Sequence, residues 1–572
     1  MAKFYEHSIN LLIFFSIIIS VAFYINFNRG IEFTDESYVL LISMYPNEIL
    51  GRVNNSGIIG HFLLQIVDNN IYYFRLLGAG LLLSASMTLV NPISKFQSTI
   101  LDLEGCKKRY LILIFILGTL SYYHNWVITP SYDLYNLIGI LIFINGLIRF
   151  TFIVNFNWKI LFPTLLVIFG GLISFICKPT TTVFLILIYM MWILYFFNLK
   201  KIFILCLISI CLSLFIFYAY ILIFSHDLEF YYNDIMIGIE LKILLDPRYS
   251  ILGNFLSTMK QILFYYYSNI SYLVIFFVAL FSFKILFKKT FNDFAFVLIF
   301  LPLFFTDSLL FTLLFIIFFY LLFDLHLTKI FKTDKKNITF LFYNFILIFI
   351  LYAYVVGTNT NVIVLLERPS IILFLIIFTF ILKFKDKKFF SFKKINLLFF
   401  ILIIFVLKNL FDNFEKPRRY RAEIYKQKNE INLMSFNGKI YVDDYTFSFI
   451  NEVQKIFEKN GWKKGNSLID LTGRTPGLNI IVGARFVSDP WWGAGYVGTN
   501  AKVIKLLNNS KFEKIKKSWI ATSDYSININ PKLLNTIGLD INKDYVLVGN
   551  IRLKSFDESF IKNIQFWKPK YQ

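Results

Sequence analysis

The feature that most constrains this chain is a series of hydrophobic segments that recurs from near its start to residue 411. A helix needs about 20 mostly apolar residues to cross a bilayer. The segments therefore predict a polytopic α-helical membrane protein with about 13 spanning helices, in which 292–306 and 309–327 alternatively form one long kinked helix. The segments are 8–27, 71–90, 110–126, 134–153, 160–177, 181–198, 202–224, 262–283, 292–306, 309–327, 339–356, 370–384 and 395–411.

Charge in the connecting loops predicts the orientation. A formal charge of +21 would suggest a nucleic-acid partner, but Lys and Arg gather in short loops between the segments, as topology determinants do, so we expect no nucleic acid. Alternate loops, such as the one containing Lys107 and Lys108, are the richer ones. With a cytoplasmic N-terminus and an odd number of spans, residues 412–572 lie on the outer face. The first segment follows Lys3 and lacks a small-residue cleavage site, so we expect an uncleaved anchor.

Two adjacent carboxylates, Asp35 and Glu36, stand in the first outer loop just after the first segment. Carboxylates beside a bilayer are costly to desolvate, so they usually have a task or a partner. Alternatively, Thr34 caps a helix whose dipole the two acids complement. The loop also contains two short amphipathic stretches, 36–44 and 58–67, which suit helices lying in the membrane interface.

Other charged residues on the predicted outer side each have two interpretations. Arg75 suits a snorkelling anchor or a lipid-phosphate ligand. Asp133 follows a Thr-Pro-Ser turn where the chain re-enters the bilayer, and suits a site residue or a helix cap. Lys178 precedes three threonines and suits an anion site or a membrane anchor. Glu367 and Arg368 suit substrate contact or a surface ion pair with each other.

Beyond residue 411 the composition changes from apolar to mixed and charged. We interpret 412–429 as a charged linker and 430–572 as one small soluble domain with an α/β fold. Four strands and two helices are expected there. The strands are 440–442, 467–471, 519–522 and 545–551, and the helices are 447–460 and 501–508.

Two stretches of this domain are unusual. The first, 470–477, is a loop after a strand, where α/β sheets place ligand contacts. The second, 489–498, is rich in glycine and contains Trp491 and Trp492, which suit sugar stacking. Alternatively, both indoles are buried against the membrane domain or lie among lipid headgroups. We assign neither stretch a catalytic role.

These features together resemble the GT-C class of integral membrane glycosyltransferases. The resemblance rests on a single anchor helix, an outer loop that opens with Asp35-Glu36-Ser37-Tyr38, two interfacial stretches, and Arg75 at the next helix. The stretches 129–133 and 178–181 are similar to motifs of bacterial relatives, nearest to protein O-mannosyltransferases and lipid A aminoarabinose transferases. The resemblance covers the membrane half, 1–411, well and the C-terminal domain poorly.

The resemblance implies a multi-pass enzyme of the bacterial cytoplasmic membrane. It would move a sugar, with inversion, from a polyprenyl-phosphate donor to an envelope glycan, lipid or protein on the outer face. No cofactor is certain, and a divalent metal is compatible with the family, although Asp35-Glu36 is not a D-x-D pattern. The implied catalytic residues are Asp35 as base, Glu36 and Asp133, and the implied phosphate-binding residues are Lys178, Arg75 and Arg368. Four aromatic residues are candidates for substrate contact: Tyr38, Tyr132, Trp491 and Trp492.

Two other classes of membrane protein remain open. A ligase that joins a polyprenyl-linked glycan to a lipid or protein would use Arg and His in a large outer loop. His226 and Arg248, in a loop at 225–261 that we expect to be a partly helical cover, offer limited support. A transporter or flippase would place ionisable residues inside the spans and show repeats between the two halves. The sequence shows few such charges and no convincing repeat.

Overall fold

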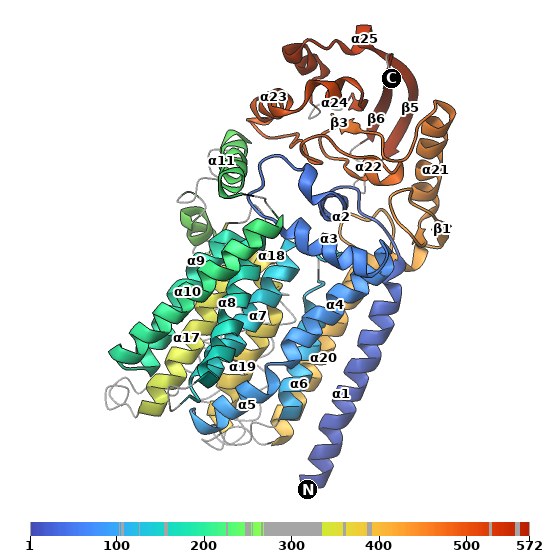
Figure 1. Ribbon diagram of the computed structural model, residues 1–572. Helices are drawn as coiled ribbons and strands as arrows, with labels where there is room; N and C mark the ends of the chain where they lie inside the picture. Colours follow the sequence, from blue (N-terminus) through green and yellow to red (C-terminus); the bar gives the residue numbers. More distant parts are fainter. Residues whose placement is uncertain are drawn as a thin grey trace.

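A computed structural model describes residues 2–101, 103, 108–124, 126–153, 158–224, 227–245, 335–357, 362–385, 392–524, 529–554 and 561–570, with scattered positions between 253 and 267. The molecule is elongated, with a helical bundle at one end and a smaller domain containing β-strands at the other (Figure 1). The N-terminus lies at the far end of the bundle, and the C-terminus lies in the smaller domain (Figure 1).

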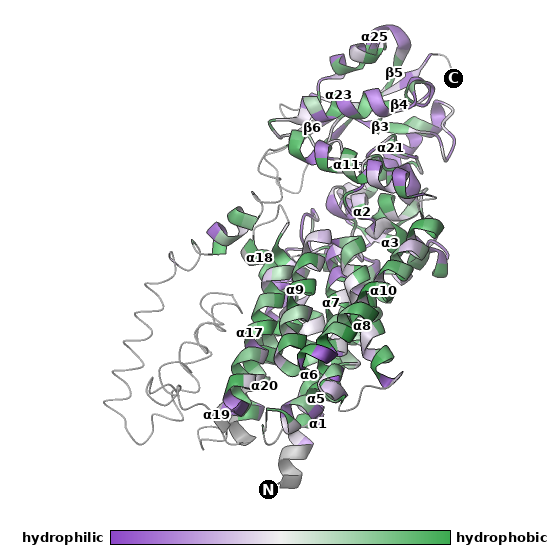
Figure 2. Ribbon diagram, turned by 60° about the vertical axis from the view of Figure 1, so that its left-hand side comes forward, coloured by the Kyte–Doolittle hydropathy of each residue, from purple (hydrophilic) through white to green (hydrophobic). Residues whose placement is uncertain are grey.

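Eight helical stretches of the described residues are long and apolar enough to cross a membrane. Figure 2 shows apolar residues along the bundle helices and a mixture of polar and apolar residues in the C-terminal domain. These observations support a multi-pass membrane protein. The stretches correspond to helices α1 (Ala2–Tyr24), α4 (Ile71–Met87) with α5 (Val90–Thr99), α7 (Tyr132–Phe150), α8 (Leu161–Cys177), α9 (Pro179–Phe196), α10 (Leu199–Phe224), α17 (Lys335–Val355) and α20 (Phe392–Glu415).

Two further predicted segments form helices too short to meet the same measure. The segment 110–126 forms α6 (Lys108–Ser121), which is buried along most of its length among α1, α4, α19 and α20. The segment 370–384 forms α19 (Ser370–Lys385), also apolar and buried. The segments 292–306 and 309–327, and almost all of 262–283, lie outside the described residues, so the expectation of about 13 spans stays a prediction.

Glycine allows α7 and α8 to approach closely in the bundle. A β-carbon at Gly139 of α7 would stand 2.8 Å from the Gly170 carbonyl oxygen, and one at Gly170 of α8 would stand 2.4 Å from the Gly139 oxygen. Small residues at such crossings increase van der Waals contact between helices where no hydrophobic effect drives them together. This contact fixes the start of α7 beside the end of α8, where Asp133 and Lys178 lie.

The first outer loop folds into two helices between the bundle and the C-terminal domain (Figure 1). They are α2 (Asp35–Met44) and α3 (Ser56–Ile66), joined through a 3₁₀ turn at Pro46–Glu48, so both amphipathic stretches are confirmed as helical. Leu40 and Leu41 of α2 share a core with residues of the C-terminal domain. The α2–α3 pair is therefore a platform on which that domain rests.

The C-terminal domain is built on a four-stranded sheet of order β3-β4-β6-β5, plus a separate β1–β2 pair. Strand β3 pairs with β4 in parallel, whereas β4–β6 and β6–β5 are antiparallel. All four predicted strands and both predicted helices are confirmed; β1 and β6 were not predicted. The strands are β1 (Asn429–Ile431), β2 (Ile440–Val442), β3 (Leu468–Asp470), β4 (Trp519–Ser523), β5 (Tyr545–Lys554) and β6 (Ile561–Pro569); the helices include α21 (Asp444–Lys459), α22 (Gly477–Ile481), α23 (Thr499–Asn509), α24 (Phe512–Lys516) and α25 (Ile541–Asp544).

Two segments with no firm predicted structure connect the halves. Helix α11 (Leu228–Leu245) confirms that the loop 225–261 is partly helical, and it packs against α23 of the C-terminal domain. Helix α20 continues to Glu415, into the segment expected to be a linker. The chain after α20 then folds back onto the first outer loop, which brings the arginines of that segment to the site described next.

Candidate active site

The first turn of α2 is held by reciprocal hydrogen bonds between Glu32 and Glu36. The Glu32 amide donates to Glu36 Oε2 at 3.0 Å, and the Glu36 amide donates to Glu32 Oε2 at 2.8 Å. Glu32 Oε1 accepts from the Thr34 amide at 2.9 Å and from the Thr34 hydroxyl. Thr34 thus precedes the helix without capping it through its side chain, contrary to the expected alternative. Glu32 instead accepts from the free amides of the first turn.

Glu36 and Arg75 form a fully buried ion pair below this turn. Arg75 Nη2 lies 2.8 Å from Glu36 Oε1, and both side chains are 0% exposed. Arg75 also donates to Thr129 Oγ1 at 3.1 Å and to the main-chain oxygens of Phe27 and Gly30. With its N–H groups so engaged, Arg75 is neither a snorkelling anchor nor placed to contact a phosphate. The geometry favours a structural role for this pair, in which Arg75 holds Glu36 and the first loop in place.

Asp35, next to Glu36 in sequence, points instead toward the chain that follows α20. Its side chain is 42% exposed, and its Oδ2 lies 2.8 Å from Arg419 Nη1 and 3.4 Å from Arg418 Nη2. Arg419 also donates to Thr34 Oγ1 at 2.7 Å. Asp35 is therefore an accessible carboxylate held in one orientation by two guanidinium groups.

Trp126 connects Asp35 with the second acidic residue, Asp133. The guanidinium carbon of Arg418 lies 4.3 Å from the centre of the Trp126 ring, and that of Arg368 lies 3.2 Å from it. Arg368 in turn forms an ion pair with Asp133, and both are essentially buried. The expected surface pair between Arg368 and its neighbour Glu367 is therefore wrong.

Arg368 keeps donors without partners. Its Nε and Nη2 are buried and make no hydrogen bond within the described part of the chain, and Asp133 Oδ1 is also unmatched there. Unmatched buried donors destabilise a fold by roughly 1–3 kcal/mol each unless something binds them. Asp133 lies in the first turn of α7, where Ser131 occupies the cap position, so Asp133 is not the helix cap. The pair therefore has buried donors that no acceptor in the described ranges matches.

Lys178 lies at the junction of α8 and α9, where it is 5% exposed. Its ammonium donates to the Tyr354 main-chain oxygen, and Thr180 and Thr181 donate to the oxygens of Val356 and Ala353 at 3.0 Å each. These residues satisfy carbonyls at the C-terminus of α17, which carries partial negative charge. The ammonium therefore has one donor engaged, which leaves the predicted anion contact open.

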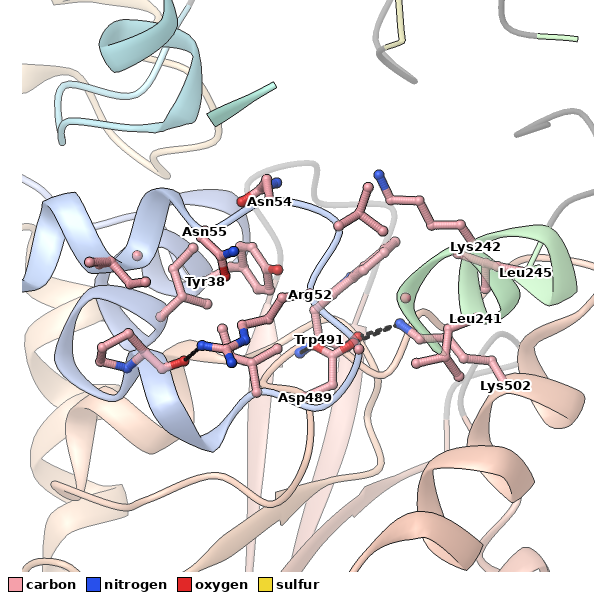
Figure 3. Close-up of a pocket in the computed structure, with 18 residues that line it drawn as sticks. Tyr38, Arg52, Asn54, Asn55, Leu241, Lys242, Leu245, Asp489, Trp491 and Lys502 are labelled. Atoms are coloured by element: carbon pink, nitrogen blue, oxygen red, sulfur yellow. Dashed lines mark hydrogen bonds and ion pairs between the residues drawn. The ribbon is translucent and has the colours of Figure 1, made fainter. Parts of the chain in front are cut away.

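A cavity of about 120 Å³ opens between the first outer loop, α11 and the C-terminal domain. Figure 3 shows Tyr38 and Trp491, two of the predicted substrate-contact residues, in its lining. Tyr38 follows Asp35 by three positions on α2, so the two lie on one face of the helix. Burial and the nearby charge of Asp489 raise the pKa of Tyr38, which keeps its hydroxyl neutral. Other polar lining residues are Arg52, Asn54, Asn55, Lys242, Asp489 and Lys502.

Ion pairs hold the cavity walls together. Arg52 Nε lies 2.6 Å from Asp234 Oδ2 of α11, and Lys502 Nζ lies 2.9 Å from Asp489 Oδ2. Lys502 also lies over the Trp491 ring, 5.0 Å from its centre. The walls of the cavity and the Trp491 ring are therefore held in place before any ligand arrives.

The remaining predicted substrate contacts lie elsewhere. Trp492 is 1% exposed in a core that residues of the C-terminal domain share with Leu241 of α11, so its place confirms the alternative of burial. Tyr132, the first residue of α7, is half-buried within electrostatic reach of Asp35 and Asp133.

Sequence reasoning missed Glu32, Trp126, Arg418, Arg419 and Tyr420, whose hydroxyl donates to Glu36 Oε2 at 3.3 Å. The only available signal was the cluster of basic residues after Pro417, which the sequence equally well explains as a charged linker. Glu32 is 2% exposed, and burial together with the charge of Asp35 raises the pKa of its carboxyl to about 7.

The carboxylates of Asp35 and Glu36 do not converge. Asp35 turns toward Arg419 and Glu36 toward Arg75, so the two do not form a joint donor set for a divalent metal. Within the described ranges, no group of three His, Cys, Asp or Glu side chains is placed to hold one. We derive no step through a metal.

The chain has no match among family models, curated proteins or solved structures.

Proposed function

We propose that this protein is an integral membrane glycosyltransferase of the GT-C class. It moves a sugar from a polyprenyl-phosphate donor to an envelope glycan, lipid or protein on the outer face of the bacterial cytoplasmic membrane. The observation that carries the proposal is that one site contains an accessible carboxylate, Asp35, and a buried guanidinium, Arg368, whose Nε and Nη2 have no acceptor among the described residues. The two are linked through Arg418 and Trp126 at the top of the bundle.

Such a site supplies both charges that glycosyl transfer requires. Asp35 accepts the proton of the acceptor hydroxyl as its oxygen attacks the anomeric carbon. The bond between that carbon and the phosphate oxygen breaks, and the polyprenyl phosphate leaves with the electron pair. Arg368 and Lys178 stabilise the negative charge that develops on the phosphate. Attack opposite the leaving group inverts the anomeric carbon.

The cavity lined by Tyr38 and Trp491 suits the sugar of the acceptor. Aromatic rings pack against the apolar face of a sugar, and amides such as Asn54 and Asn55 hydrogen-bond its hydroxyls. Because Tyr38 lies one turn from Asp35, a glycan in this cavity extends toward the base.

No observation on the described residues favours the ligase alternative. His226 and Arg248, on which it depended, lie outside the described residues. For the transporter alternative, the buried Asp133–Arg368 pair is the type of feature expected, but it lies at the outer end of the bundle.

The test is a donor scan with the purified chain in proteoliposomes. Labelled sugars are offered as polyprenyl phosphates and as nucleotide sugars, and the anomeric configuration of the product is read by NMR. We expect transfer from polyprenyl phosphates alone, with release of one polyprenyl phosphate per sugar and inverted configuration. Transfer from a nucleotide sugar, or retained configuration, would contradict the proposal.

A further inference from the structure

A second cavity, of about 90 Å³, lies between the first outer loop and the C-terminal domain. Its floor is formed by residues 31–34, immediately before Asp35, and its walls come from the segment after α20 and from the C-terminal domain. Four basic residues line it against a single carboxyl group, that of Glu32. The basic residues are Arg419, Arg421, Arg474 and Lys554.

Three of these cations have no acidic partner among the described residues. Arg421, Arg474 and Lys554 form no ion pair within the described part of the chain. Arg421 lies over the Tyr445 ring at 3.8 Å, and its Nη1 is buried and makes no hydrogen bond there. Glu32 accepts hydrogen bonds from its own helix turn, and its Oε1 also lies 3.9 Å from Arg419 Nη1. The cavity is therefore lined by positive charge, and Arg421 Nη1 is a buried donor to which no described residue supplies an acceptor.

The unusual stretch 470–477 positions Arg474 in this cavity. Asp470 is buried and accepts from the Thr472 and Thr475 amides at 3.0 and 2.9 Å, which fixes the loop. Arg474 Nε donates to the Ala494 oxygen at 2.9 Å. A β-carbon at Gly495 would stand 2.6 Å from Arg474 Nη2, so glycine there leaves room for the guanidinium. Both unusual stretches of the domain thus serve to place one arginine.

The same loop docks on the first outer loop. The Gly477 amide donates to the Phe33 oxygen at 3.0 Å, and a β-carbon at Gly477 would stand 2.5 Å from the Phe33 ring. Arg419 lines the cavity and also contacts Asp35 at 2.8 Å. An anion in the cavity therefore lies beside the proposed base, on the side of the C-terminal domain.

We propose that this cavity binds an acidic group, a phosphate or a carboxylate, carried by the acceptor. The inference rests on the proposed function, because it assigns the acceptor's charge and the role of the C-terminal domain. Arg421 and Arg474 bind the acidic group. Arg419 lies between this group and Asp35, because it lines the cavity and also contacts Asp35. An acceptor anchored there presents its hydroxyl to the base in a fixed orientation.

Binding is tested by equilibrium measurements on the full chain in detergent, with inorganic phosphate and glucuronate as probes. We expect Arg421→Gln/Arg474→Gln to weaken binding of at least one probe by about tenfold or more. The matched control is Lys463→Gln/Lys532→Gln, which removes two charges from exposed positions outside the cavity and should bind as wild type does. Thermal unfolding of each variant verifies the fold. Equal binding by the two double variants, or no binding by wild type, would overturn the proposal.

The source of the anion is decided in nanodiscs. Phosphate binding that is unchanged between phosphatidylcholine and phosphatidylglycerol discs supports an acceptor group, whereas competition by phosphatidylglycerol would assign the cavity to a lipid headgroup and overturn the acceptor assignment. Asp35→Asn separates the two proposals, because it should abolish transfer while the probes still bind in a manner that depends on Arg421 and Arg474. Binding that depends on Arg421 and Arg474 without any transfer would contradict the proposed function alone.

Discussion

Asp35 and Glu36 are adjacent in sequence, but their side chains lie in different electrostatic environments. Glu36 is turned inward and carries the charge of Arg75 in a fully buried pair. Asp35 is turned outward to Arg418 and Arg419 and keeps 42% of its side chain exposed. The first-loop acid that supports the fold and the acid that we propose as the catalytic base are therefore different residues, and their substitutions should have different effects.

Replacing Glu36 by Gln should destabilise the protein rather than slow its chemistry selectively. Removing one member of a buried ion pair leaves the other charge uncompensated, which costs about 3–5 kcal/mol. Glu48→Gln is the control, because Glu48 pairs with Arg485 and Lys514 at the surface, where such pairs contribute about 0–1 kcal/mol. Thermal unfolding in detergent measures both, and equal shifts would contradict the structural role of Glu36.

Glu32 should give the protein a pH-dependent stability. Burial and Asp35 raise the pKa of its carboxyl from 4.5 to about 7, so the folded state binds more protons than the unfolded state between those values. Its contribution to the unfolding free energy is fully present below pH 4.5 and is lost as pH rises through 7, by about 3 kcal/mol at most. Unfolding midpoints at pH 5 and pH 8 measure this. In Glu32→Gln the difference should shrink, and an unchanged difference would contradict the assignment.

At the scale of elements, the sequence predicted α2, α3 and most of the C-terminal strands, because apolar periodicity and turn residues act locally. It did not predict what α2 faces. Arg418 and Arg419 approach Asp35 only because α20 ends near the first loop and the next turn folds back over that loop. Trp126 was likewise predicted as the last residue of a hydrophobic segment and not as a site residue. Long-range contacts of this type leave no periodic signal in one sequence.

Helix α11 should set how well the acceptor binds. A β-carbon at Gly238 would stand 2.5 Å from the Gly51 oxygen, so Gly238→Ala must move α11 away from the wall of the Tyr38–Trp491 cavity. We expect a severalfold rise in the KM for the acceptor with a smaller change in kcat. Gly80→Ala in α4 is the control, because a β-carbon there meets nothing within 4 Å. An unchanged KM in Gly238→Ala would contradict the role of α11.

At the scale of the whole molecule, the C-terminal domain covers the outer side of the first loop. The Gly30 amide donates to the Tyr441 oxygen at 2.7 Å, and the Leu50 amide donates to the Ser488 oxygen at 2.7 Å. The sequence predicted an α/β fold for this domain. It did not predict how the domain attaches to the first loop, because main-chain hydrogen bonds of this type are independent of side-chain identity. The domain and the first loop therefore act as one unit.

The predicted orientation across the membrane can be tested by cysteine labelling in intact cells. In a chain whose four cysteines are replaced, Lys463→Cys in the C-terminal domain should react with an impermeant maleimide. Lys200→Cys, at the start of α10 in a predicted inner loop, should react only after permeabilisation. The reverse pattern would place the site on the cytoplasmic face and contradict the use of an outer-face lipid donor.

The measurement that tests the central claim most directly is the rate of sugar transfer by Asp35→Asn. The substitution keeps the shape of the side chain and removes the base, so transfer should fall by about 10²-fold or more at unchanged protein level. Asp68→Asn is the matched control, since Asp68 is exposed in the same loop at a φ of 51° that asparagine also adopts. Transfer by Asp35→Asn at the rate of Asp68→Asn would contradict the assignment of Asp35 as the catalytic base.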